Sequence, residues 1–242
     1  MPGGKPGLHS IKCWGLGLKR RVQDLEVKNE SAEEFSREKP QKIIVSGDSH
    51  LKSISQGKLI NTTGKTIEVL KAYCSRDDWL WAWKPDVSIA SVLLQQVHSR
   101  ATHLVMTSPT SDITNLGKLD PEIRLHWIDL SAKTIISTAE MCLIRFPALK
   151  SVTILEHLPR CDSKELNSLR LIANDLIRKE ANVSIMRSQI SVAFNEMEPS
   201  SPAEVYQLFG CKGQRGHDGI HLRGPQGPDQ LFGTLTRVIS SL

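Results

Sequence analysis

Short runs of β-branched and apolar residues recur along the chain, and they constrain the fold more than any other feature. Ile43-Ile44-Val45 and Val152-Thr153-Ile154-Leu155 have the length and composition of strands that are buried on both faces. Further strands are predicted within Thr66–Tyr73, at Leu104–Thr107 and at Val183–Met186. Because buried runs of this kind are typical of parallel sheets, they favour a sheet of about five strands.

Helical patterns lie between these runs. Glu165–Lys179 has apolar residues at i, i+3 and i+4 spacing, and Ser131–Phe146 carries an apolar stripe on one side. A last helix is predicted around Asp229–Ser241, and His50–Ile54 can open another. Parallel strands that alternate with helices are joined by right-handed crossovers, which place helices on both faces of the sheet. The sequence therefore predicts a three-layer α/β sandwich, with functional groups at the carboxyl ends of its strands.

The length of 242 residues and the hydrophobic content of 39% suit one domain with a sizeable core. Residues 1–40 differ from the rest, because they begin with Pro2-Gly3-Gly4 and then become rich in charge. Few large apolar residues occur between Val27 and Gln41. We therefore predict a flexible charged N-terminal arm over residues 1–40 and an α/β domain over residues 41–242.

Five cysteines are widely spaced and form no C-x-x-C pair, which argues against a disulfide framework and a common zinc module. A reducing compartment fits this pattern. No signal-peptide segment and no run of about 18 apolar residues is visible, so we expect an intracellular, cytoplasmic protein without a membrane span. The net charge of +5 is compatible with weak attraction to nucleic acid but does not predict a nucleic-acid partner.

Two motifs at opposite ends of the α/β region carry the predicted chemistry. Gly47-Asp48-Ser49 follows the first strand, and Asp218-Gly219-Ile220-His221 lies near the end of the chain. A serine becomes nucleophilic when a neighbouring base takes its proton, and an acid can hold that base in the right tautomer. We therefore predict Ser49 as the nucleophile, His221 as the base and Asp218 as the acid that orients it.

The second motif also permits another interpretation. Cys211, His217 and His221 are types of residue that bind metal ions. Two histidines four apart share a metal when they lie on a helix, but Gly216 and Gly219 disfavour a helix here. We therefore predict no metal site and no cofactor.

Both motifs resemble blocks of the SGNH (GDSL-type) hydrolase superfamily, whose members are flavodoxin-like α/β esterases and lipases. Gly47-Asp48-Ser49 is similar to the first block, Asp218-x-x-His221 is similar to the last, and the likeness runs from about Lys42 to Leu242. The resemblance implies a flavodoxin-like strand order and a serine carboxylic ester hydrolase that works through an acyl-enzyme. It also implies a catalytic triad of Ser49, His221 and Asp218.

The middle blocks depart from this family pattern. The third block, G-x-N-D, matches Pro109-Thr110-Ser111-Asp112, so Ser111 stands where the family has an oxyanion-binding asparagine. Asn115 is the nearest amide that can substitute for it. The family's second block supplies a glycine N–H, but Ala72–Ser75 contains no glycine, which leaves Gly64 and Cys74 as candidates. Loss of one oxyanion donor costs about 10²- to 10³-fold in rate.

Two functions therefore remain open. One is a serine esterase that acts on a small-molecule, glycan or lipid ester. The other is a catalytically weak or inactive SGNH-like binding or scaffold domain, since similar domains occur in the first-open-reading-frame proteins of some LINE retrotransposons, with nucleic acid as one kind of partner. Trp79, Trp81 and Trp83 fit packing at the sheet edge, an acyl-binding wall or lid near the site, or a platform for stacking. The sequence predicts neither the oligomeric state nor the acyl group of the substrate.

Overall fold

The computed structural model of the protein describes residues 41–47, 49–71, 100–108, 110–195, 197–210 and 218–242, except for the side chains of Lys71 and Ser111. Residues 41–242 form one compact unit. The predicted N-terminal arm of residues 1–40 lies outside the described residues, as does the cluster of Trp79, Trp81 and Trp83.

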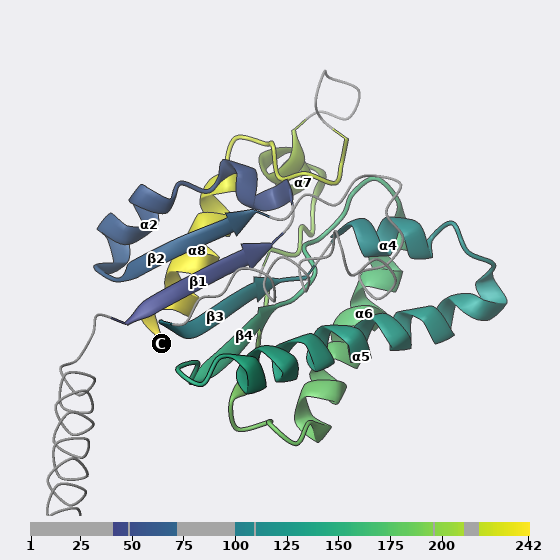
Figure 1. Ribbon diagram of the computed structural model, residues 1–242. Helices are drawn as coiled ribbons and strands as arrows, with labels where there is room; N and C mark the ends of the chain where they lie inside the picture. The colour runs from purple at the N-terminus through teal and green to yellow at the C-terminus, as the bar shows by residue number, and fades with distance from the viewer. Residues whose placement is uncertain (1–40, 48, 72–99, 109, 196, 211–217) are drawn as a thin grey trace, which may run out of the picture. The chain divides into compact units, whose positions relative to one another are not determined.

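Five strands form one sheet in which every neighbouring pair is parallel (Figure 1). They are β1 (Lys42–Gly47), β2 (Thr66–Lys71), β3 (Ala101–Thr107), β4 (Ser151–Leu155) and β5 (Ile190–Ala193), in the order β2-β1-β3-β4-β5. This is the flavodoxin-like strand order. The predicted α/β sandwich with about five parallel strands is confirmed.

Two long helices cover one face of the sheet, α5 (Pro121–Arg145) and α6 (Lys164–Val183) (Figure 1). Ile44, Leu104 and Ile154 point to this face and form one apolar cluster with residues of both helices. The short helix α4 (Thr110–Leu116) follows β3 and packs against α5 and α6 through Ile113 and Leu116. Burial of these apolar side chains anchors α5 and α6 to the sheet and α4 to these two helices.

The opposite face is covered by α2 (Gln56–Thr63), α7 (Pro202–Phe209) and α8 (Gly227–Ser240). Ile43, Val45 and Val105 point to this face, because successive residues of a strand project to opposite sides of the sheet. The strands are therefore apolar on both faces, which explains their continuous runs of β-branched residues. Helices on both faces complete the predicted three layers.

The predicted fifth strand at Val183–Met186 is wrong. Val183 is the last residue of α6, and the strand that completes the sheet is Ile190–Ala193. Val183 is 66% exposed and Ile185 is 88% exposed, so their apolar side chains gain no burial that would favour a strand there. Ile190, in contrast, is buried and pairs with Val152 of β4.

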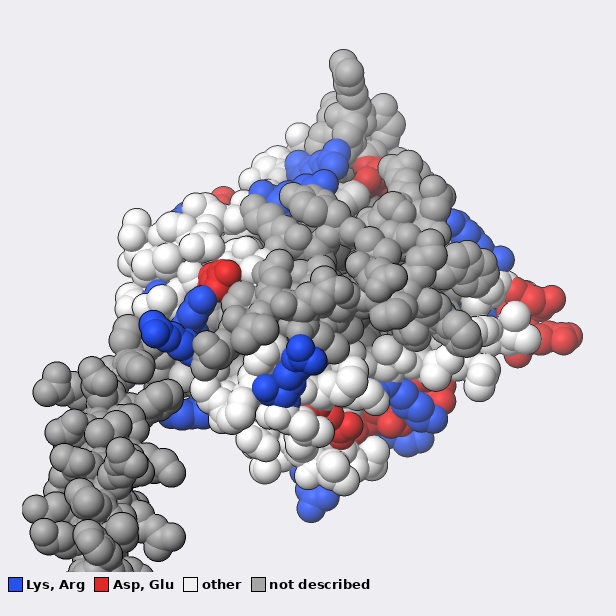
Figure 2. All heavy atoms as spheres, in the orientation of Figure 1, with Lys and Arg blue, Asp and Glu red and all other residues white. Residues whose placement is uncertain are grey.

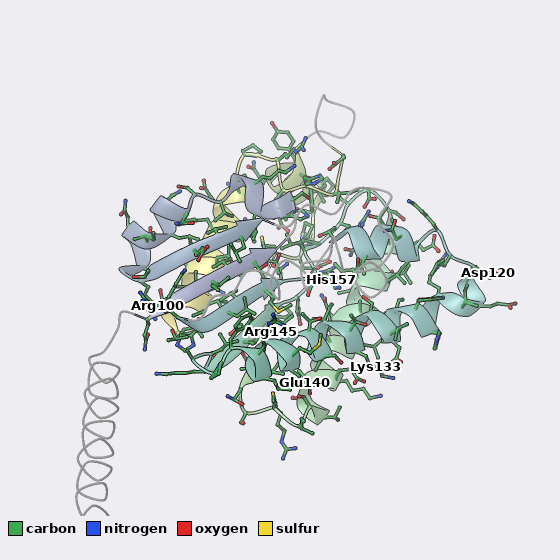
Figure 3. All side chains as sticks on the ribbon, in the orientation of Figure 1. Arg100, Asp120, Lys133, Glu140, Arg145 and His157 are labelled. Atoms are coloured by element: carbon green, nitrogen blue, oxygen red, sulfur yellow. The ribbon has the colours of Figure 1, made fainter. Side chains whose placement is uncertain are left out.

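The carboxyl ends of the parallel strands meet at one edge of the sheet. A 3₁₀ helix, η1 (Ser49–Ser53), follows β1 here, α4 follows β3, and the loop 156–163 follows β4. Its second residue, His157, is labelled in Figure 3 beside this edge. Among the described residues, no helix is long and apolar enough to cross a membrane.

Candidate active site

Ser49 is the first residue of η1 and lies two positions beyond the end of β1. The path of the backbone from β1 to Ser49 depends on Gly47, which packs closely against β3. A Cβ atom at position 47 would lie 1.9 Å from Oγ1 of Thr107, far inside contact distance. Glycine is therefore required at the end of β1, and its close packing fixes the point where Ser49 leaves the sheet.

The structure brings Ser49 together with His221 and Asp218, the other two residues of the predicted triad. Oγ of Ser49 lies 2.8 Å from Nε2 of His221, and Nδ1 of His221 lies 2.7 Å from Oδ2 of Asp218. An ionised carboxylate only accepts hydrogen bonds, so Nδ1 carries a proton, and in the neutral ring Nε2 then accepts from the serine hydroxyl. This is the tautomer that a general base for Ser49 requires.

Both carboxylate oxygens of Asp218 accept hydrogen bonds. Oδ1 accepts from the backbone N–H groups of Ile220 and His221, each at 2.9 Å, while Oδ2 accepts from the His221 ring. Partial burial on its own would raise the pKa of Asp218, but these N–H donors and the imidazole outweigh it and lower the pKa to about 2. Asp218 is therefore a carboxylate across the physiological pH range.

Gly219 allows the tight turn between Asp218 and His221. Its φ angle is +74°, in the left-handed region that side chains disfavour, and a Cβ atom there would lie 2.9 Å from the backbone nitrogen of Asp162. The carbonyl of Gly219 accepts a hydrogen bond from the N–H of Cys161 at 2.9 Å. The loop after β4 therefore supports the turn that carries the acid and the histidine.

His50 belongs to this site although sequence reasoning placed it only in the helix after Ser49. It is 5% exposed, and its ring centroid lies 5.1 Å from that of His221 with the planes tilted by 33°. Nε2 of His50 shares a hydrogen bond of 3.0 Å with Oγ1 of Thr110, the first residue of α4. The only signal in the sequence is its position next to Ser49, because its partners come from remote segments.

The structure does not bring the residues predicted to bind the oxyanion together beside Ser49 among the described residues. Gly64 does not lie at this edge: it ends α2 in a left-handed conformation and precedes Thr66, which pairs with Lys42 at the amino end of β1. A strand of this length spans about 20 Å, so the prediction for Gly64 is wrong. The amide oxygen of Asn115 accepts from Lys118 on the exposed side of α4. The side chain of Ser111 and all of Cys74 lie outside the described residues.

An open pocket of about 100 Å³ adjoins the serine and the histidine. Its described lining consists of Ser49, His50, Lys52, Ser53, His221, Leu222 and Arg223. These residues include two cations, Lys52 and Arg223, and no carboxylate. Figure 2 shows blue Lys and Arg atoms in the region where η1 and α7 lie in Figure 1, with red atoms close by.

The alternative metal cluster has no support within the described ranges. No three His, Cys, Asp or Glu side chains there are grouped as a metal ion would require. Cys211 and His217, two of the residues in that interpretation, lie outside these ranges.

Comparison with solved structures finds the same fold in several esterases. A carbohydrate acetylesterase family member from Sinorhizobium meliloti matches with a TM-score of 0.54 and 13% identity, covering 84% of this chain and 100% of its own. A carbohydrate esterase family 3 protein from Talaromyces cellulolyticus matches with a TM-score of 0.54 and 11% identity, covering 83% of this chain and 97% of its own.

A protein from Bacteroides ovatus, predicted to be a GDSL-like lipase, matches with a TM-score of 0.51 and 13% identity. The match covers 83% of this chain and 53% of that longer protein. No family model matches the chain, and no curated protein matches it in sequence. The resemblance predicted from the two motifs is confirmed at the level of the fold, which the chain shares with solved proteins described as a GDSL-like lipase and carbohydrate esterases.

Proposed function

We propose that residues 41–242 are a serine ester hydrolase of the SGNH type. The observation that carries this proposal is the chain of hydrogen bonds from Ser49 through His221 to Asp218, with distances of 2.8 and 2.7 Å. Such an arrangement aligns a hydroxyl, an imidazole whose Nδ1 faces the acid, and an ionised carboxylate. The esterases of the same fold support the choice of an ester as the substrate.

Each group has a defined step in this reaction. Oγ of Ser49 attacks the ester carbonyl carbon while its proton passes to Nε2 of His221, and Asp218 stabilises the imidazolium that forms. The imidazolium then gives this proton to the departing alcohol oxygen, which leaves an acyl-enzyme on Ser49. Water attacks the acyl carbon, His221 takes its proton, and return of that proton to Oγ releases the acid and free Ser49.

The oxyanion of the tetrahedral intermediate needs hydrogen-bond donors close to Ser49. The backbone N–H of Ser49 is one candidate, because the first residues of a helical turn have no acceptor within that turn. Ser111 at the start of α4 is a second candidate. The open pocket suits a small acyl group on an exposed alcohol, so we propose a small-molecule, glycan or lipid ester as the substrate.

Hydrolysis of p-nitrophenyl acetate tests this function directly. Ser49→Ala removes the nucleophile and should lower kcat/KM by at least about 10³-fold. Ser168→Ala is the matched control, because that hydroxyl donates to Lys164 on the exposed surface of α6, remote from the pocket. The control should retain kcat/KM within about threefold. Equal rates for wild type and Ser49→Ala would overturn the proposal.

A binding or scaffold domain is the second candidate. The observation that favours it is the position of Gly64, which leaves the glycine N–H of the family's second block without a counterpart among the described residues. A fluorophosphonate separates the two candidates, since it labels an activated serine without requiring ester turnover. Folded protein that hydrolyses no ester and leaves Ser49 unlabelled would favour the scaffold; rapid labelling that depends on His221 would favour the hydrolase.

A further inference from the structure

We propose that Arg160 is a positioning residue that holds the start of α4 and the Asp218–His221 turn in register around Ser49. The proposal rests on the proposed hydrolase function and adds a residue that lies outside both motifs. Arg160 is in the loop after β4, where its side chain contacts one segment of the site and its neighbours contact the other.

All three guanidinium nitrogens of Arg160 donate hydrogen bonds inside the protein. The residue is 3% exposed, and its Nε and Nη2 donate to the two carboxylate oxygens of Asp162 at 3.0 and 2.6 Å. Nη1 donates to the backbone carbonyl of Thr110 at 3.1 Å and to Oγ1 of Thr114 at 2.7 Å. The side chain therefore connects its own loop to the first two turns of α4 through a buried, paired charge.

The backbone next to Arg160 supports the second motif. The N–H of Cys161 donates to the carbonyl of Gly219, and Gly219 packs against the backbone of Asp162 so closely that a Cβ atom would not fit. Asp162 thus has two roles, because its carboxylate fixes Arg160 and its backbone abuts the turn. Residues 160–162 act as one clamp between α4 and the turn that carries Asp218 and His221.

The two segments that this clamp joins both contact or carry the imidazole of His221 or its neighbour His50. On one side, Gly219 lies between Asp218 and His221. On the other, Thr110 shares a hydrogen bond with His50, whose ring lies 5.1 Å from that of His221. A shift of α4 relative to the turn would change the position of the His221 ring relative to Ser49. Misplacement of a reacting group by about 1 Å can cost about 10²-fold in rate.

Arginine is the side chain that this position requires. Its planar fork donates to a carboxylate with two nitrogens while the third group reaches a separate carbonyl and hydroxyl, whereas lysine offers one point charge. Arg170 provides a matched control within the same chain. It is 2% exposed, pairs with Glu198 and donates to the carbonyl of His157, and these acceptors belong to neither α4 nor the turn.

The test compares Arg160→Ala with Arg170→Ala in hydrolysis of p-nitrophenyl acetate by the full chain. Arg160→Ala should lower kcat by about 10²-fold and leave KM within about threefold, because the alignment of the reacting groups is lost while the pocket remains. Millimolar guanidinium should restore part of this kcat, since it can occupy the space of the missing side chain. A sodium salt of equal ionic strength should not.

Arg170→Ala should show neither the selective loss of kcat nor the rescue by guanidinium. If Arg160→Ala does not fold, Thr114→Val decides, because it removes one acceptor of Arg160 and keeps the shape of the side chain. It should lower kcat by about threefold to tenfold. Unchanged kcat in the folded Arg160 or Thr114 variants, or equal effects at Arg160 and Arg170, would overturn the proposal. Failure of the hydrolase function itself is distinct, because Ser49→Ala would then equal wild type.

Discussion

Ser49 and His221 are 172 positions apart in the sequence, yet Oγ of Ser49 lies 2.8 Å from Nε2 of His221. Ser49 follows β1, and His221 lies in the segment that leads into α8. The contact forms because both segments reach the carboxyl edge of the same parallel sheet, where groups from distant parts of an α/β chain meet.

Asp218→Asn should abolish most of the activity without moving the turn. The asparagine oxygen can keep the two backbone hydrogen bonds of Oδ1, which leaves the NH₂ group facing Nδ1 of His221. Nδ1 must then lose its proton and Nε2 must carry one, so the ring can no longer accept the proton of Ser49. We expect kcat to fall by about 10⁴-fold.

Steady-state kinetics with p-nitrophenyl acetate measure this loss. Asp229→Asn, which changes an exposed carboxylate paired with Lys58, is the control and should keep wild-type kcat. A kcat for Asp218→Asn within tenfold of wild type would show that Asp218 does not set the tautomer of His221.

Asp218 should also make the free energy of unfolding depend on pH in the acidic range. Its pKa is about 2 in the folded protein, against an ordinary value of 3.8 for an aspartate, so folding favours the carboxylate. The stabilisation is complete above about pH 4 and is lost as the pH falls through about 2. It should be on the order of 1 to 2 kcal/mol after allowance for partial exposure.

Urea unfolding of wild type and Asp218→Asn between pH 2 and 7 measures this contribution as the difference between the two free energies of unfolding. The difference should be largest near neutral pH and should shrink below about pH 4. A difference that stays constant down to pH 2 would contradict a lowered pKa for Asp218.

Gly219→Ala and Gly64→Ala form a matched pair. Both glycines have φ near +70°, so alanine should destabilise each variant by about 1 to 2 kcal/mol. A Cβ atom meets the backbone of Asp162 at position 219 but nothing within 4 Å at position 64. Only Gly219→Ala should therefore move the turn and lower kcat as well as the melting temperature. Equal kcat values in the two variants would contradict the role of the clamp.

Lys52 and Arg223 predict a preference for negatively charged esters. Both line the pocket beside Ser49, where a carboxylate on the substrate would meet two positive charges. The ratio of kcat/KM for p-nitrophenyl hemisuccinate to that for p-nitrophenyl acetate should fall about two- to fivefold in Arg223→Gln, as expected for an exposed ion pair. Arg187→Gln, an exposed arginine in the turn after α6, should leave the ratio unchanged. Loss of activity toward both esters alike would count against a charge effect.

The elements that the sequence predicted correctly are those with local causes. Buried strands such as Ile43–Val45 and Val152–Leu155 need continuous apolar runs, and α6 needs an apolar stripe. The sequence therefore predicts the three-layer fold from these local patterns. The error at Val183–Met186 has a tertiary cause. An apolar pair at alternate positions resembles a strand, but burial decides the outcome, and Ile185 is 88% exposed.

The amino-acid sequence alone was enough to establish the α/β class and to identify Ser49, Asp218 and His221 as candidates, because the two motifs place each residue type beside a strand end or a glycine turn. The surroundings of these three residues depend on the tertiary structure. The folded chain places His50 against His221, joins Arg160 to α4 and locates Gly64 at the far end of the sheet. These relationships join segments that are remote in sequence, so they depend on the packing of the whole sheet and leave no pattern in any single segment.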